Sequence, residues 1–155
     1  MARVDIFPFS DIGTGYGERY PDWVRGLKAS NGVYVIRERR DGVIAYVGES
    51  HTDRLYGTLT RHFQAWSPRY ETAGPTYDRA DIEVAAVIVV ALHALALQND
   101  LICSLEPRDN RLVCGGIYEG QDETIPTEPP GYDYDVSQVI QALFYEHGQA
   151  DDVPF

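Results

Sequence analysis

Two tyrosines lie in short triplets whose residue types and spacing could form the floor of a chemical site. The triplets are Gly32-Val33-Tyr34 and Tyr46-Val47-Gly48, with eleven residues between the two tyrosines. Both triplets fall in β-branched and aromatic runs that predict neighbouring strands. A glycine next to the tyrosine in each strand allows another group to approach the backbone closely. This arrangement favours a site over a packing coincidence.

A second group of reactive side chains follows in the next predicted element. Arg54, Arg61 and His62 fall, with Thr58, within one arc of a predicted helix. Two guanidinium groups beside an imidazole, one helix after the paired tyrosines, could hold and polarise a phosphodiester. The alternative is a solvated basic edge of the helix, which such a pattern also produces.

The turn between the two tyrosine strands decides whether their phenols meet. Tyr34 and Tyr46 are an even number of residues apart, so they share a face of a hairpin only if the loop has an odd count or a bulge. We predict a three-residue loop, Arg40-Asp41-Gly42, with Gly42 in the left-handed conformation. This loop would bring the two phenols to one face.

Hydrophobic periodicity predicts the elements that must position these residues. The predicted strands are 33–37, 43–47 and a buried central strand at 82–90. The predicted helices are 53–66, capped by Thr52 or Asp53, then 92–105 and 136–147. Residues 1–30, 67–80 and 118–135 are expected to be irregular.

The helix predicted at 92–105 carries one polar residue in its apolar arc. Gln98 lies among Ala94, Leu95 and Leu101 on a helical wheel. Because buried polar groups need partners, Gln98 is either a satisfied core amide or a side chain facing a cleft.

Charge is divided unevenly along the chain, whose formal net charge is −11. Residues 1–80 hold 11 of the 13 basic residues against 10 acidic ones, whereas residues 81–155 hold 2 basic and 14 acidic residues. A polyanion should therefore meet the first half of the chain. We further expect a soluble, cytoplasmic protein with no membrane-spanning segment and with Cys103 and Cys114 reduced.

Taken together, these residues resemble the GIY-YIG nuclease family, with the two tyrosine triplets as its signature motifs. Two later matches support the resemblance: Arg61-His62-Phe63, and the run from Gln98 through Pro107 to Asn110. The resemblance implies an α+β fold in which a small three-stranded antiparallel sheet is flanked by helices. It also implies cleavage of a DNA phosphodiester by water, assisted by one Mg²⁺ or Mn²⁺ ion.

The resemblance assigns a role to each matching residue. Tyr34 would be the general base or a water-orienting phenol, and Tyr46 a second phenol bonding to it or to the phosphate. His62 would position the nucleophile or the phosphate. Gly32, Gly48 and Asn110 would give structural support, Asn110 to the metal-binding helix.

Two positions depart from the family pattern. The family's metal ligand is a glutamate, and this chain has Gln98 there; a neutral amide is a weaker ligand for a hard cation. The family arginine stands one helical turn before the histidine, where this chain has Thr58. Arg54 and Arg61 are both candidates to replace that arginine, and Arg54 is favoured.

Two hypotheses follow for function. The first is a DNA endonuclease of this type, inactivated or not by Gln98. The second is a non-catalytic module on a nuclease fold that binds nucleic acid or protein, with residues 81–155 suited to a basic protein partner. In either case we expect one compact unit: an N-terminal extension at 1–30, a nuclease-like domain at 30–112, and an acidic loop with a short helix at 113–155.

Overall fold

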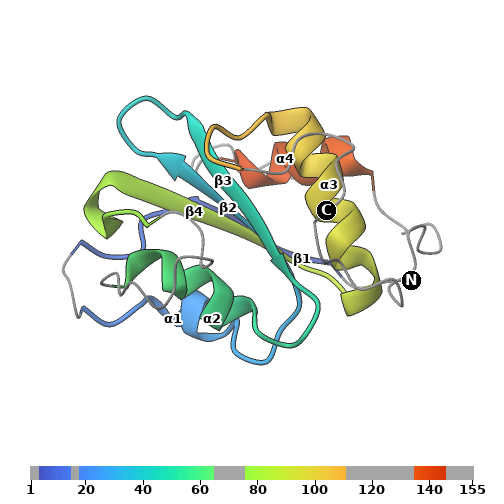
Figure 1. Ribbon diagram of the computed structural model, residues 1–155, viewed down its shortest axis with the longest axis horizontal. Helices are drawn as coiled ribbons and strands as arrows, with labels where there is room; N and C mark the ends of the chain where they lie inside the picture. Colours follow the sequence, from blue (N-terminus) through green and yellow to red (C-terminus); the bar gives the residue numbers. More distant parts are fainter. Residues whose placement is uncertain (1–3, 15–17, 65–75, 111–134, 146–155) are drawn as a thin grey trace.

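The fold is a mixed α and β sandwich in which one antiparallel sheet lies between two helical layers (Figure 1). The computed structural model describes residues 4–14, 18–64, 76–110 and 135–145. Helices α1 and α2 cover one face of the sheet, and α3 and α4 cover the other. The expected α+β class is therefore confirmed.

Among the described residues the sheet has four strands, whereas three were predicted. They are β1 (Asp5–Ser10), β2 (Gly32–Glu38), β3 (Ile44–Ser50) and β4 (Ile82–Ile88), in the order β1-β4-β2-β3. All neighbours are antiparallel. The unpredicted strand is β1, which lies in the segment expected to be irregular. Pro8 argued against a strand, but β1 is an edge strand whose register shifts between Phe7 and Ser10, and such positions tolerate proline.

Three of the four described helices lie at predicted positions, with corrections at their ends, whereas the first lies in the segment 1–30 that was expected to be irregular. They are α1 (Asp22–Arg25), α2 (Leu55–Thr60), α3 (Ala91–Leu105) and α4 (Val136–Leu143), with 3₁₀ turns η1 (Arg61–Phe63) and η3 (Arg79–Asp81). Neither predicted residue caps α2. Asp53 has a φ of 61°, and the Ser50 hydroxyl instead accepts a hydrogen bond from the Arg54 N–H at 3.0 Å. Two helices end earlier than predicted: α2 gives way to η1 at Arg61 and Gln64 is extended, and α4 ends at Leu143 and not at His147.

Each face of the sheet has its own hydrophobic core. Tyr34 and Ile36 of β2 point into the core beneath α1 and α2, whereas Val33 and Val35 point into the core beneath α3 and α4. This alternation is the period of two that a strand imposes on its side chains. Each side chain on β2 or β3 therefore faces one of the two helical layers, and its position along the strand decides which one.

Two further expectations can be compared with the structure. Cys103 on α3 is disulfide-bonded, which contradicts the expectation that it is reduced. Within the described ranges, no helix combines the length and apolar character needed to cross a membrane.

Candidate functional site

The two signature tyrosines share the face of the sheet that α1 and α2 cover. Tyr34 pairs with Gly48, and Ile36 pairs with Tyr46, so both phenols lie on the side of the first core. Cross-strand partners project to the same face of a sheet. The predicted meeting of the two phenols is confirmed, and their ring centroids are 6.2 Å apart.

A β-bulge, and not the predicted three-residue loop, produces this shared face. The Glu38 N–H donates to the Val43 carbonyl, so the loop spans residues 39–42. That loop alone would place the tyrosines on opposite faces. The register then shifts between Ile36 and Arg37, where β3 has one extra residue. This extra residue returns Tyr46 to the face of the sheet on which Tyr34 lies. Gly42 has the predicted left-handed conformation, with a φ of 74°.

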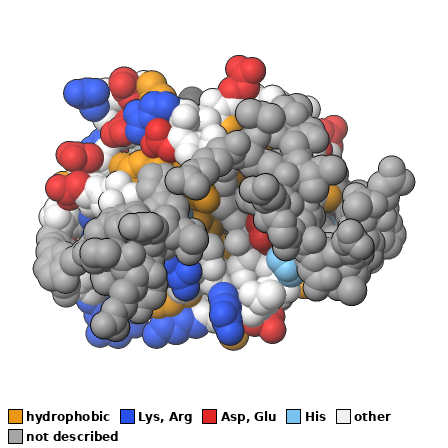
Figure 2. Space-filling view, viewed as in Figure 1, with side chains coloured by type: hydrophobic (Ala, Val, Ile, Leu, Met, Phe, Trp, Pro, Cys, Tyr) orange, Lys and Arg blue, Asp and Glu red, His pale blue; other side chains and the backbone are white. Residues whose placement is uncertain are grey.

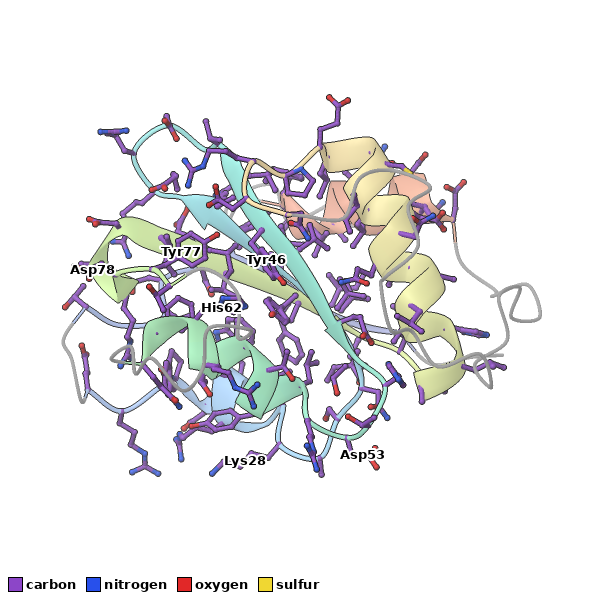
Figure 3. The ribbon with its side chains drawn as sticks, viewed as in Figure 1. Lys28, Tyr46, Asp53, His62, Tyr77 and Asp78 are labelled. Atoms are coloured by element: carbon purple, nitrogen blue, oxygen red, sulfur yellow. The ribbon has the colours of Figure 1, made fainter. Side chains whose placement is uncertain are left out.

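His62 completes a compact cluster with the two tyrosines. The turn η1 directly follows α2 and directs His62 toward the sheet, where it is 2% exposed. Its Nε2 atom shares a hydrogen bond of 2.6 Å with the Tyr34 hydroxyl. The Tyr46 ring lies 4.7 Å from the imidazole, centroid to centroid. Figure 3 shows Tyr46 and His62 converging between the sheet and α2.

Both signature glycines are required by close contacts. A Cβ atom on Gly48 would lie 2.3 Å from Cζ and from the hydroxyl oxygen of Tyr34. Gly32 has a φ of 151°, and a Cβ there would lie 2.0 Å from the Val87 carbonyl oxygen on β4. Gly48 therefore makes room for the site phenol, whereas Gly32 allows β2 and β4 to approach.

Asn110 ties the segment after α3 to the edge strand β3. Its Oδ1 accepts a hydrogen bond from the Val47 N–H, and its Nδ2 donates to the Val47 carbonyl, both at 2.8 Å. The amide thus substitutes for a neighbouring strand at a position next to Gly48. This contact gives Asn110 a structural role at β3.

Replacing Asn110 by alanine is expected to lower the free energy of unfolding by about 1 to 3 kcal/mol, because two backbone groups of Val47 lose their partner. Urea unfolding measures the change. Asn110→Asp is the informative companion, because it keeps the acceptor for the Val47 N–H but places an oxygen against the Val47 carbonyl. Asn110→Asp should therefore also destabilise, and wild-type stability in both variants would contradict the role.

The two candidate arginines lie on the outside of the α1 and α2 layer. Arg54 immediately precedes α2 and Arg61 begins η1, and both are exposed. Within the described residues, neither guanidinium forms an ion pair. Figure 2 shows Lys and Arg side chains gathered along its lower edge, where α1 and α2 lie. The structure favours neither Arg54 nor Arg61 as the replacement for the missing arginine.

Gln98 lies in the helical layer on the other side of the sheet. It is 2% exposed on α3, whose neighbours Leu97 and Leu101 pack in the second core, so its expected burial is confirmed. Tyr34 belongs to the first core. The edge strand β3 runs between α2 and α3 (Figure 1). A ligand that contacts both Tyr34 and Gln98 would therefore have to lie across the edge of β3.

The donors at these positions do not fit a Mg²⁺ or Mn²⁺ ion. Gln98 supplies a neutral amide oxygen, which is a weak ligand for a hard cation because it contributes no charge. The nearby carboxylate of Asp109 is held by Arg108 at 2.9 Å and by the Tyr77 hydroxyl at 2.8 Å. In the part of the chain that the structure describes, no three His, Cys, Asp or Glu side chains form a group that could hold a metal.

Tyr77 is a third phenol at the site, and no periodic pattern pointed to it because it lies in a predicted loop. Its ring centroid is 5.9 Å from that of His62, and its N–H donates to the His62 carbonyl at 2.7 Å. Burial is the main cause that raises the Tyr77 pKa above its ordinary value, and the hydrogen bond to Asp109 adds to it. Tyr77 is therefore a neutral phenol at physiological pH.

Glu49 and His51 form a second polar pair near the site that sequence reasoning did not identify. Glu49 pairs with Val33, so it faces the α3 side of β3. Its Oε2 lies 3.0 Å from Nδ1 of His51. Burial raises the pKa of the Glu49 carboxyl, and the hydrogen bond from His51 opposes that rise.

A scan against models of protein families, a search of curated proteins and a search of solved structures each found no match. The site is therefore interpreted from its own geometry. That geometry brings together Tyr34, Tyr46 and His62, adds Tyr77, and leaves the two arginines on the outer surface and Gln98 in the opposite layer.

Proposed function

We propose that this chain is a DNA endonuclease domain of the GIY-YIG type whose metal-dependent hydrolysis is disabled by Gln98. The observation that carries the proposal is the 2.6 Å hydrogen bond between Tyr34 and His62, with Tyr46 stacked on the Tyr34 ring and tilted against the imidazole. Together these contacts join residues from both triplets and from the turn η1 that follows α2. The need for glycine at positions 32 and 48 supports the same assignment.

The cluster offers chemistry suited to water attack on a phosphodiester. With Nε2 of His62 unprotonated, Tyr34 donates its proton to the imidazole as its oxygen accepts a proton from water. The half-buried Tyr46 lies against the same imidazole, and in this proposal it would contact the phosphate. Arg54 and Arg61 on the exposed side of this layer would hold the flanking phosphates.

The missing element is a charged oxygen at position 98. In the family, a glutamate there holds the divalent cation, which stabilises the charge that develops on the phosphate. Because the donors present do not fit such an ion, no step of the chemistry in this chain is assigned to a metal. The chain is expected to bind DNA without cutting it.

The alternative is a module that binds nucleic acid or protein and has no catalytic potential. The neutral Gln98 side chain is 2% exposed on α3, and this burial favours the alternative, because a core amide needs no metal. A protein partner for the acidic residues 81–155 also belongs to this alternative. The two functions differ in whether a carboxylate at position 98 restores cleavage.

DNA binding tests the substrate class. We expect the protein to bind a fluorescent DNA duplex at low salt, and Arg54→Ala and Arg61→Ala to weaken binding about threefold or more each, because each phosphate contact contributes to affinity. Fluorescence anisotropy at several salt concentrations measures both the affinity and its salt dependence.

Arg40→Ala is the matched control, because Arg40 lies in the β2–β3 loop and its side chain is 88% exposed. It should leave the affinity close to that of the wild type. Equal losses in all three variants would indicate a general charge effect and contradict the proposed surface. If the protein binds no DNA, the proposal that DNA is its substrate is wrong.

A further inference from the structure

A series of polar contacts connects the β2–β3 hairpin to Tyr77, whose ring contacts that of His62. Glu38, at the end of β2, accepts a hydrogen bond from Arg108 at 3.0 Å. Arg108 also contacts both carboxylate oxygens of Asp109, at 2.9 and 3.0 Å. Asp109 in turn accepts a hydrogen bond from the Tyr77 hydroxyl at 2.8 Å. The Tyr77 ring is therefore fixed at its outer end.

Tyr77 also contacts His62 in two ways, through its backbone and through its ring. The Tyr77 N–H donates to the His62 carbonyl at 2.7 Å, and the two rings lie 5.9 Å apart. His62 is thus enclosed by Tyr34, Tyr46 and Tyr77. Figure 3 shows Tyr46, His62 and Tyr77 pointing toward one another from different elements.

Charge reinforces the fixed position of Tyr77. The Arg108 guanidinium is the main cause that holds the Asp109 pKa below its usual range, so the carboxylate stays charged. A charged acceptor makes a stronger hydrogen bond than a neutral one. The segment 108–109 is itself fastened to β3, because Arg108 N–H and Asp109 N–H donate to the Ile44 and Ala45 carbonyls.

We infer that Tyr77 is a positioning residue for His62, and that Asp109 acts through Tyr77 to hold the imidazole in the orientation that bonds to Tyr34. The inference rests on the proposed function only in treating His62 as a site residue. The hydrogen bond that one ring nitrogen makes decides which nitrogen carries the proton, and the bond between Nε2 and Tyr34 depends on the orientation of the ring, which packs against Tyr77.

Nitrogen NMR of the His62 ring tests the inference without DNA or activity. At a pH where the imidazole is neutral, the wild type should show one dominant tautomer. Tyr77→Phe keeps the ring and removes the bond to Asp109, so His62 is held less firmly against Tyr34, and the tautomer ratio should fall by up to about tenfold, the equivalent of the net free energy of one hydrogen bond between Tyr34 and Nε2. Asp109→Asn, which keeps the shape and removes the charge, should shift the ratio in the same direction.

Tyr56→Phe is the matched control, because Tyr56 lies on α2 and its ring packs against Tyr20, away from the His62 contacts. Its tautomer ratio should equal that of the wild type. An unchanged ratio in both Tyr77→Phe and Asp109→Asn would overturn the inference, as would an equal change in Tyr56→Phe. Because the ring spectrum is independent of DNA, a failure of DNA binding would leave this result intact.

Discussion

Gln98→Glu is expected to convert the protein into a nuclease that nicks supercoiled plasmid in Mg²⁺ or Mn²⁺, while the chain as written remains inactive. The exchange keeps the shape of the side chain and adds the charged oxygen that a hard cation requires. Adding Tyr34→Phe to the variant should reduce cleavage by about 100-fold or more, the usual range for loss of a general base. Gel analysis of nicked and linear DNA measures both effects.

Gln98→Glu is also expected to change the stability of the protein. A charged glutamate at a position that is 2% exposed loses most of its hydration, so the variant should melt at a lower temperature than the wild type without metal. Mg²⁺ or Mn²⁺ should raise its melting temperature, because a ligand that binds only the folded state stabilises it. The wild type should show no such rise.

Gln141→Glu is the matched control, because Gln141 is exposed on α4 and the same exchange there adds charge without burial. It should neither cleave DNA nor respond to metal. Equal cleavage by the wild type and Gln98→Glu would mean that position 98 is not the metal position. A folded Gln98→Glu variant that binds DNA but does not cleave it would support the binding module instead.

Gly32→Ala is expected to lower the free energy of unfolding by about 3 kcal/mol or more. Two costs combine: a φ of 151° is strained for alanine, and the new Cβ would lie 2.0 Å from the Val87 carbonyl oxygen. The obstructing atom is backbone on the central strand β4, so relief requires β2 and β4 to separate. Urea unfolding followed by circular dichroism measures the loss.

Gly57→Ala gives the control for this substitution. Gly57 lies in α2, and a Cβ there would meet no atom within 4 Å. The alanine should stabilise the helix by up to about 1 kcal/mol, because glycine has the lower helix propensity. Unfolding midpoints that coincide for Gly32→Ala and the wild type would refute the close approach of β2 and β4.

Local patterns predicted the elements that are regular over several residues. The triplets around Tyr34 and Tyr46 lie on adjacent strands, α3 covers the expected segment, and Gln98 is buried as its position on the helical wheel indicates. Glycine at positions 32 and 48 was identified from its type alone. These features depend on residue type and on periodicity, which are properties of short segments.

Contacts between distant segments could not be predicted in the same way. β1 is a strand despite Pro8 because it pairs with β4. A bulge in β3, and not the loop, places Tyr46 on the same face as Tyr34. Tyr77 lies in a predicted loop, yet its ring contacts that of His62. Its hydroxyl donates a hydrogen bond to Asp109, 32 residues further along the chain.

The sequence by itself determined which side chains are available for chemistry: two phenols, an imidazole and the amide of Gln98. Only the tertiary structure decided that Tyr34 and His62 share a hydrogen bond and that Gln98 belongs to the layer across the sheet. The physical reason is that residue type fixes chemical capacity locally, whereas the distance between two side chains depends on strand register and packing across the whole fold.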